Sequence, residues 1–163
     1  MTLDREIVCL AEELGPALIG RGWLAATAES CTGGGVAYAI TEVAGSSAWF
    51  DRSFVTYTNE AKQQMLGVSI DSLVRHGAVS EAVVLEMARG ALARSDARIS
   101  VAISGVAGPG GGSEEKPVGT VWFAWAEQGG RQRSLLARFE GDRHQVRQQA
   151  IRQALSGLLA LLK

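Results

Sequence analysis

The stretch AESCTGGG, residues 28–35, places a hydroxyl and a thiol next to each other and just before three glycines. Ser30 and Cys31 can each attack a carbonyl carbon once a base removes their proton. Glycine lets the backbone turn tightly and approach a ligand, and amides at the start of a helix can hold an oxyanion or a phosphate. The stretch therefore predicts a nucleophile at a strand-to-helix turn. Whether serine or cysteine is the nucleophile stays open at this point. The alternative is an ordinary glycine-rich turn without a catalytic role.

The base that would activate this nucleophile has few candidates. Of the two histidines, His76 lies in RHG at a predicted helix end, where an imidazole can cap carbonyl groups, and His144 opens the last predicted helix. Of the three lysines, Lys163 is terminal and Lys116 precedes a proline in a predicted loop, which leaves Lys62. A lysine amine has a pKa of about 10.4 in water and needs about 7 to 8 to act as a base near neutral pH. The alternative for this lysine is a solvated surface charge.

Further polar residues follow other predicted strands. The segment GVAGPGGGSEEKPVG, residues 105–119, comes after a strand that ends at Ser104, and it contains no Walker motif. At the end of a buried strand such a loop predicts an anion cradle or a substrate lid, with a merely flexible loop as the alternative. The planar guanidinium of Arg143 suits a phosphate or carboxylate, or else a surface ion pair. Tyr57 is expected to offer a hydroxyl to the site or to pack in the core.

The elements that must position these residues alternate between helical and strand patterns. The first twenty residues have helical spacing, with Gly15 and Pro16 expected to kink or split the helix. Strands are predicted at residues 23–28, 53–57, 99–104, 118–127 and 132–140. Further helices are predicted at residues 32–43, 59–66 and 80–95, with a turn from residue 69 and a closing helix over the last twenty residues. This order predicts a three-layer α/β/α sandwich around a mixed, mostly parallel five-stranded sheet.

The direction of the predicted strands brings the polar residues together. The first, second, third and fifth strands are expected to run the same way, so their carboxyl ends share one edge of the sheet. Open α/β sheets bind ligands outside this edge. We therefore expect one site there, formed by Ser30, Tyr57 with Lys62, Ser104 with its glycine loop, and Arg143.

Composition narrows the class of protein. A chain of 163 residues fits one domain, residues 1–163, and its net charge of −1 excludes a strongly basic nucleic-acid footprint. No apolar run is long enough to predict a membrane span, and the first residues lack a signal-peptide pattern. Cys9 and Cys31 have neither metal-ligand nor disulfide-framework spacing, which favours a reducing compartment. We expect a cytoplasmic protein without a metal, a membrane or a nucleic-acid partner.

Five segments, taken in order, resemble the CinA C-terminal domain family: AESCTGGG, GSSAWFDRSFVTYTNEAKQQMLGV, RHGAVSEAV, SGVAGPGGGSEEKPVGTVWFAWA and GDR. The resemblance extends from about Leu3 to the last helix. Enzymatic members of that family are nicotinamide-nucleotide amidases, which convert nicotinamide mononucleotide to nicotinic acid mononucleotide and ammonia in pyridine nucleotide salvage. The resemblance thus implies a small-molecule nucleotide substrate, no cofactor and a homodimer.

The resemblance also implies roles for individual residues. The family's nucleophile falls on Ser30 in ESCTGG and its lysine on Lys62 in NEAK, with Tyr57 as a third catalytic candidate. Substrate contacts are implied for Cys31, Gly33, Gly34, Ser104, Gly105, Gly108, Gly110, Gly111 and Arg143, with the oxyanion near Gly33 and Gly34. Ser104 stands where many relatives have threonine, so a hydroxyl is retained. Two alternatives to catalysis are a silent nucleotide-binding module and an interaction module linked to competence or DNA-damage responses.

Overall fold

A computed structural model describes residues 2–163, and its middle layer is a five-stranded sheet in the order β2-β1-β3-β4-β5. The strands are β1 (Ala25–Glu29), β2 (Phe50–Val55), β3 (Ile99–Gly105), β4 (Thr120–Glu127) and β5 (Gln132–Arg138). β1 pairs in parallel with β2 and β3, whereas β4 is antiparallel to both β3 and β5. All strands except β4 therefore run in one direction. The mixed, mostly parallel sheet is confirmed.

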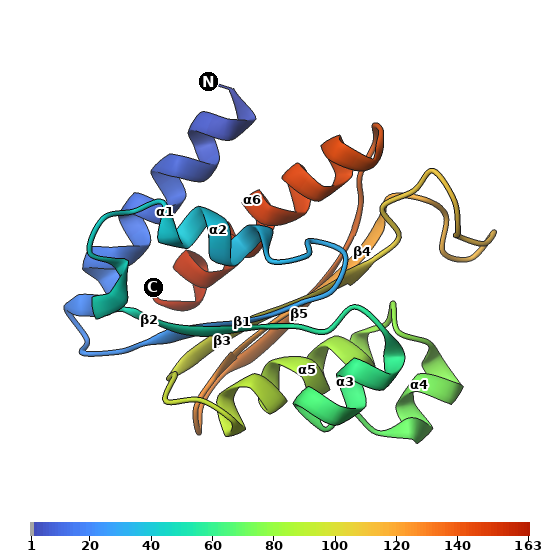
Figure 1. Cartoon of the computed structure of the whole chain (residues 1–163), viewed down its shortest axis with the longest axis horizontal. Helices are drawn as coiled ribbons and strands as arrows, with labels where there is room; N and C mark the ends of the chain where they lie inside the picture. The colour runs from blue at the N-terminus through green and yellow to red at the C-terminus, as the bar shows by residue number, and fades with distance from the viewer. Residues whose placement is uncertain (1) are drawn as a thin grey trace.

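Helices cover both faces of this sheet (Figure 1). One layer contains α1 (Leu3–Ile19), α2 (Gly35–Thr41) and α6 (Arg143–Leu161), and a 3₁₀ turn (Ser46–Ala48) precedes β2. The opposite layer contains α3 (Asn59–Leu66), α4 (Ile70–His76) and α5 (Glu81–Ala93). The three-layer α/β/α sandwich is thus confirmed. Among the described residues, no helix is both long and apolar enough to cross a membrane.

Each face of the sheet has its own apolar core, and β1 contributes to both. All five residues of β1 are buried, and their side chains alternate between the faces. Ala25 packs in the core under α1 and α6, whereas Ala26 and Ala28 pack in the core against α5. Thr27 and Glu29 therefore point to the same layer as Ala25. A carboxylate at the end of this strand is thus placed beneath α2.

The first helix differs from the sequence-based prediction. We expected Gly15 and Pro16 to kink or split it, but α1 continues without interruption to Ile19. Pro16 is exposed in the last turns, where water can bind the carbonyl oxygen that its missing N–H leaves free. Gly15 has a packing role, because a Cβ there would lie 2.9 Å from Nε1 of the buried Trp49.

The starts of the helices that carry site residues are capped by side chains. The Thr58 hydroxyl accepts a hydrogen bond from the Ala61 amide at the start of α3. At the start of α6, Asp142 and Gln145 form a reciprocal capping box. Such caps stabilise a helix start by about 1 kcal/mol each and define where its first turn begins. The positions of the residues that follow, including Lys62 in α3, are set in this way.

Candidate active site

Ser30 and Lys62 meet at the carboxyl edge of the sheet. Ser30 is the first residue after β1, and Lys62 lies near the start of α3, which follows β2. The Lys62 Nζ lies 2.9 Å from the Ser30 Oγ. Ser30 is 7% exposed and Lys62 only 1%, so this contact is shielded from bulk water. The geometry therefore supports the predicted pairing of these two groups.

The surroundings of the Lys62 amine favour its neutral form. Besides Ser30, Nζ contacts two main-chain oxygens, Thr56 O at 2.8 Å and Tyr57 O at 3.2 Å. Across residues 2–163, no carboxylate forms an ion pair with this amine. Burial lowers the pKa of Lys62 from 10.5 to about 8. A neutral amine can donate its two hydrogens to the carbonyls and accept the Ser30 proton on its lone pair.

Cys31, the alternative nucleophile, has a different environment. Its side chain is 6% exposed, and burial raises the pKa of the thiol to about 12. A thiol with this pKa stays protonated near neutral pH, and the protonated form is a poor nucleophile. The geometry therefore favours the Ser30 hydroxyl over the Cys31 thiol.

The amides of Gly33 and Gly34 in the nucleophile turn, residues 30–34, were expected to face an oxyanion but already have acceptors within the protein. The Gly33 amide donates to Ser30 O at 3.0 Å, and the Gly34 amide donates to Glu29 Oε1 at 3.1 Å. These two glycines have positive φ angles of 57° and 94°, which explains the glycines there. Within the described chain, the amides of Cys31 and Thr32 have no protein acceptor. An oxyanion held by this turn would thus meet amides that precede the glycines.

A cavity of about 160 Å³ opens at Ser30 and gathers most of the predicted side chains. It is lined by Ser30, Cys31, Tyr57, Lys62, Ser104, Gly105 and Arg143, together with Ala78, Val79 and Ala107. The strand directions thus bring four segments far apart in sequence to one place, as expected for the carboxyl edge of such a sheet. Ala78 and Val79, in the loop between α4 and α5, were missed because neither side chain is reactive.

Five predicted glycines do not line this cavity. Gly33 and Gly34 lie in the nucleophile turn behind Ser30, and Gly110 and Gly111 are exposed on the loop between β3 and β4. Gly108 lies near its mouth, where its carbonyl accepts a hydrogen bond from Arg143. Its φ angle is +84°, and a Cβ there would lie 2.5 Å from a Val118 methyl group. In the structure these glycines shape the backbone around the cavity.

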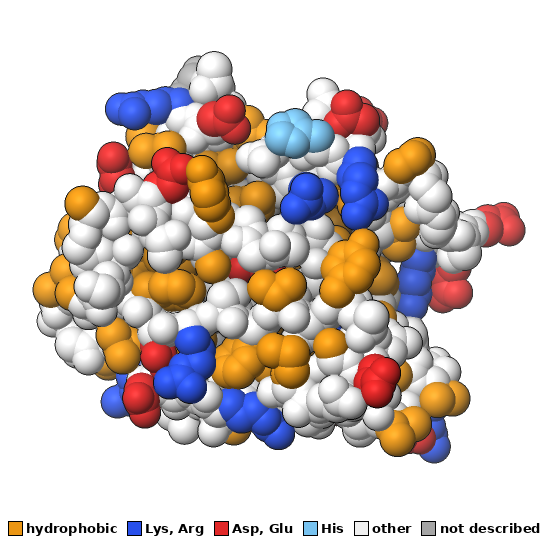
Figure 2. Space-filling view, in the orientation of Figure 1, with side chains coloured by type: hydrophobic (Ala, Val, Ile, Leu, Met, Phe, Trp, Pro, Cys, Tyr) orange, Lys and Arg blue, Asp and Glu red, His pale blue; other side chains and the backbone are white. Residues whose placement is uncertain are grey.

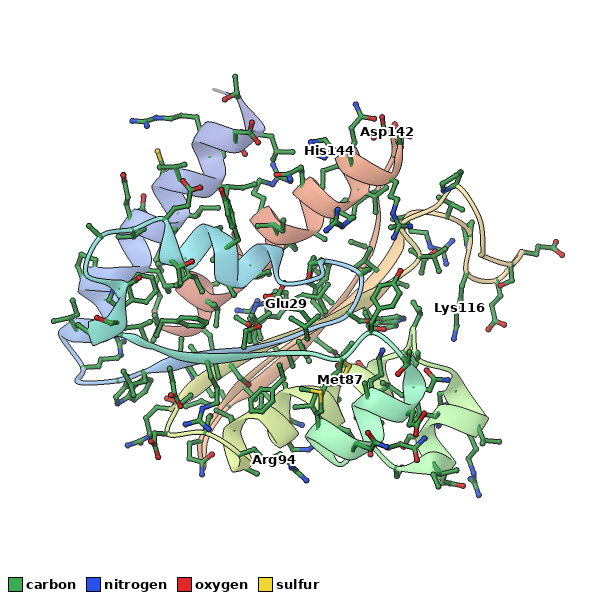
Figure 3. All side chains as sticks on the ribbon, in the orientation of Figure 1. Glu29, Met87, Arg94, Lys116, Asp142 and His144 are labelled. Atoms are coloured by element: carbon green, nitrogen blue, oxygen red, sulfur yellow. The ribbon has the colours of Figure 1, made fainter. Side chains whose placement is uncertain are left out.

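A second hollow, of about 650 Å³, adjoins the cavity and shares Ala107 and Arg143 with it. Its remaining lining is Pro109, Val118, Gly141, Asp142, His144 and Arg147. Figure 2 shows basic side chains beside a histidine over the amino end of α6, and Figure 3 places Asp142 and His144 there. Basic groups beside a cavity that holds a nucleophile suit a substrate with an anionic group.

Arg143 connects the two hollows. Its Nη1 donates to Gly108 O at 2.7 Å, and its Nη2 donates to the Tyr57 hydroxyl at 3.2 Å. The Tyr57 side chain is exposed, so it lies at the mouth of the cavity, whereas its main-chain carbonyl contacts Lys62. Tyr57 thus contributes two groups to the site, its hydroxyl and its main-chain carbonyl, and sequence analysis anticipated only the hydroxyl.

The histidines lie away from the Ser30 Oγ. His76 ends α4, and its carbonyl accepts a hydrogen bond from Lys116, which reaches down from the loop between β3 and β4 (Figure 3). His144 faces the second hollow, and neither imidazole lines the cavity at Ser30. In residues 2–163, no three histidine, cysteine, aspartate or glutamate side chains are grouped closely enough to hold a metal ion.

Two charged residues that sequence analysis did not single out form hydrogen bonds with the nucleophile turn. Glu29 accepts hydrogen bonds from the turn, and Arg147 of α6 donates to Cys31 O at 3.0 Å and to Thr32 O at 3.2 Å. A signal for Glu29 was present, since it is the one charged residue in the strand AATAE. Nothing in the local sequence pointed to Arg147, because α6 lies more than a hundred residues further along the chain.

The fold and the site together define an α/β/α protein with a buried serine–lysine pair at the carboxyl edge of its sheet. The chain belongs to the CinA C-terminal domain family, whose sequence profile matches residues 8–162.

Several proteins are similar to this chain in sequence or structure over nearly its whole length. It is 59% identical over 155 residues to the nicotinamide-nucleotide amidohydrolase PncC of Escherichia coli (strain K12), covering 95% of this chain and 94% of that protein. It is 54% identical to the protein of the same name from Pseudomonas putida, covering 95% and 96%. The crystal structure of the competence/damage inducible protein CihA from Agrobacterium tumefaciens matches with a TM-score of 0.95 at 48% identity, covering 97% of this chain and 96% of that one.

Proposed function

We propose that this protein is a nicotinamide-nucleotide amidase that hydrolyses the carboxamide of nicotinamide mononucleotide, releasing nicotinic acid mononucleotide and ammonia. The observation that carries the proposal is the buried Lys62 amine, 2.9 Å from the Ser30 hydroxyl in a cavity. The amidohydrolases of E. coli and P. putida, at 59% and 54% identity, support the substrate. The reaction would serve pyridine nucleotide salvage.

The proposed chemistry is acyl transfer through Ser30. Neutral Lys62 takes the hydroxyl proton as the Ser30 Oγ attacks the carboxamide carbon. The tetrahedral intermediate then loses its C–N bond, and Lys62 gives the proton to the leaving nitrogen, so ammonia departs and an ester remains on Ser30. Water, deprotonated by Lys62, attacks this ester. The C–Oγ bond breaks, the Ser30 oxygen takes the proton from Lys62, and the acid product leaves as a carboxylate after its own proton passes to solvent.

The oxyanion of each tetrahedral intermediate needs hydrogen-bond donors that are not otherwise engaged. We assign this role to the amides of Cys31 and Thr32, because the amides of Gly33 and Gly34 already have acceptors. Successive amides in a turn can form a concave donor site for an anion. Arg147 supports this arrangement: it holds the carbonyl of Cys31, so the Thr32 amide in the same peptide plane points away from it.

The two hollows divide the substrate between them. The cavity at Ser30, about 160 Å³, suits a planar pyridine carboxamide, with the Ser104 hydroxyl in its wall. The adjoining hollow of about 650 Å³ would take the ribose phosphate beside Arg143, His144 and Arg147. A guanidinium fork binds a phosphate with two parallel hydrogen bonds, although Arg143 must exchange its present partners to do so.

Product formation by defined variants tests this proposal. Ser30→Ala is expected to lower the rate of nicotinic acid mononucleotide formation at least about 10³-fold while the protein stays folded, because the attacking atom is lost. Cys31→Ala should retain most activity, and Ser134→Ala, on the edge strand β5, is the matched serine control. Full activity in Ser30→Ala would exclude the serine mechanism, and loss of activity in folded Cys31→Ala would favour the thiol. Substrate binding without turnover by the wild-type protein would identify a silent binding module.

The assembly and location of the protein are also proposals. The family resemblance suggests a homodimer, and two cysteines without a disulfide framework suggest a reducing compartment, the cytoplasm. The net charge of −1 argues against direct contact with nucleic acid. Light scattering after size-exclusion chromatography would measure the mass of the assembly. A monomer at micromolar concentration would contradict the dimer.

A further inference from the structure

The last residue of β1 is a buried carboxylate next to the nucleophile. Glu29 is 0% exposed and precedes Ser30 directly. Figure 3 shows it between α2 and the sheet, on the face where Val101 and Ile103 of the neighbouring strand belong to the apolar core. Among residues 2–163, no lysine, arginine or histidine forms an ion pair with it. A carboxylate in such a place requires hydrogen bonds in place of water.

Six donor groups lie within hydrogen-bond distance of the two carboxylate oxygens. Oε1 accepts from the Thr32 hydroxyl at 2.7 Å, the Gly34 amide at 3.1 Å and the Val36 amide at 3.0 Å. Oε2 accepts from the Ala37 amide at 3.0 Å. It also lies 3.1 Å from the Thr27 hydroxyl and 3.3 Å from the Ser53 hydroxyl, and because these two hydroxyls share a hydrogen bond at 2.6 Å, one of them donates to Oε2 at a time. Four of the six donors belong to the nucleophile turn and the first turn of α2. The side chain thus holds the segment that follows its own backbone.

The backbone of Glu29 is connected to the other half of the catalytic pair. Its carbonyl accepts a hydrogen bond from the Thr56 amide at 2.8 Å, and the Thr56 carbonyl in turn accepts one from the Lys62 amine at 2.8 Å. Glu29 is therefore connected to both members of the pair. Its side chain holds the turn that carries Ser30, and its main chain holds Thr56, whose carbonyl contacts Lys62. Neither carboxylate oxygen forms a hydrogen bond with Ser30 or Lys62, so Glu29 acts through these neighbours.

We propose that Glu29 is a positioning residue, whose carboxylate holds the nucleophile turn so that the Ser30 hydroxyl faces the Lys62 amine. By engaging the Gly34, Val36 and Ala37 amides, it also leaves those of Cys31 and Thr32 as the ones available to an oxyanion. The inference rests on the proposed function in taking Ser30 as the nucleophile. It goes beyond that function because it assigns a role to a residue that does not touch the substrate.

Glu29→Gln is the sharpest perturbation, because it keeps the size and shape of the side chain. Each carboxylate oxygen accepts a hydrogen bond from at least one backbone N–H group, and such a group can only donate. Whichever oxygen the glutamine NH₂ replaces, two donors would then face each other, and the turn must shift. A displacement of about 1 Å at a reacting group costs on the order of 10²-fold in rate. We expect kcat to fall about 10²-fold, with KM changing less than about threefold.

The experiment compares Glu29→Gln with Glu86→Gln. The Glu86 carboxylate also accepts a backbone hydrogen bond, from the Ser69 amide at 2.9 Å, but lies on α5 away from the site. kcat and KM for nicotinamide mononucleotide are measured, and thermal unfolding gives the folded fraction. A second readout is the rate at which an alkyl fluorophosphonate labels Ser30, followed by intact mass. In that reaction an Oγ–P bond forms, fluoride leaves, and Lys62 takes the proton. We expect labelling to slow at least about 30-fold in Glu29→Gln and less than about twofold in Glu86→Gln.

The outcomes separate this inference from the proposed function. If wild-type Ser30 is labelled but no acid product forms, the proposed function fails, and the labelling ratio still decides the role of Glu29. Wild-type protein that is neither labelled nor active would overturn both. Unchanged kcat and labelling in Glu29→Gln, or losses that only follow its folded fraction, would overturn the inference.

A second variant covers the case in which Glu29→Gln does not fold. Thr32→Val removes the shortest hydrogen bond to the Glu29 carboxylate and keeps the shape of the side chain. We expect a fall in kcat of at least about fivefold with little change in KM. Wild-type kcat in folded Thr32→Val would then overturn the inference.

Discussion

Amidase activity should follow the ionisation of Lys62, because only the neutral amine can take the Ser30 proton. Burial lowers the pKa of this amine to about 8. About 9% of it is then neutral at pH 7 and about 91% at pH 9, so kcat/KM should rise about tenfold across this range. With the ordinary pKa of 10.5, only about 0.03% would be neutral at pH 7. Burial therefore raises the fraction ready to act as a base about 300-fold at pH 7.

The assay measures nicotinic acid mononucleotide directly, by chromatography, from pH 7 to 9.5. The second pKa of a phosphate monoester lies near 6, so the substrate charge is nearly constant over this range. Lys62→Arg retains a cation at every pH and should show neither the activity nor the rising limb. Lys116→Met changes a lysine outside the cavity and should keep the wild-type profile. Circular dichroism at each pH confirms that the protein is folded.

Three results would refute this reasoning. A flat profile between pH 7 and 9 in a folded protein would mean that no group with a pKa near 8 limits the reaction. A rising limb with its midpoint above about 9.5 would mean that burial does not lower the pKa of Lys62 as inferred. A wild-type profile in active Lys62→Arg would show that another residue is the base.

Two further predictions concern stability and substrate binding. Because the pKa of Lys62 is lower in the folded protein, the unfolded chain binds more protons between about pH 8 and 10.5, so stability gains there as pH rises. Relative to Lys62→Met, the wild-type free energy of unfolding should increase by about 3 kcal/mol over that window in urea titrations, and parallel curves would contradict this. Arg143→Ala should raise KM for nicotinamide mononucleotide about tenfold and leave KM for the riboside nearly unchanged, since only the mononucleotide carries the phosphate. Equal changes for both substrates would remove Arg143 from phosphate binding.

Much of the fold could be predicted because its signals are local. Alternating and helical patterns placed all five strands and the other helices, with ends that differed by a few residues, whereas α4 was expected only as a turn from residue 69. One boundary difference has a clear cause: α2 was expected from residue 32 but begins at Gly35. The positive φ angles of Gly33 and Gly34 are incompatible with helix, and they extend the turn by three residues. The predicted interruption at Pro16 was wrong because the proline lies on the solvent side of α1.

The candidate site, like the fold, could be predicted only in part. Strand direction alone brought Ser30, Lys62, Ser104 and Arg143 to one edge, because parallel strands end on the same side of a sheet. The expectation that the amides of Gly33 and Gly34 face an oxyanion is not supported, since hydrogen bonds within the turn already engage them. Which amides are free depends on partners distant in sequence, and no local pattern records them.

The sequence by itself determined the order of elements, the sheet edge that carries the site, and the residue types able to do chemistry there. Only the tertiary structure decided which of them act together. The pKa of Lys62 depends on how much water the surrounding elements exclude, and the environment of Glu29 depends on donors from β1, β2 and α2. Desolvation and hydrogen bonding are properties of the packed molecule. A one-dimensional pattern can name the groups but does not contain the distances between them.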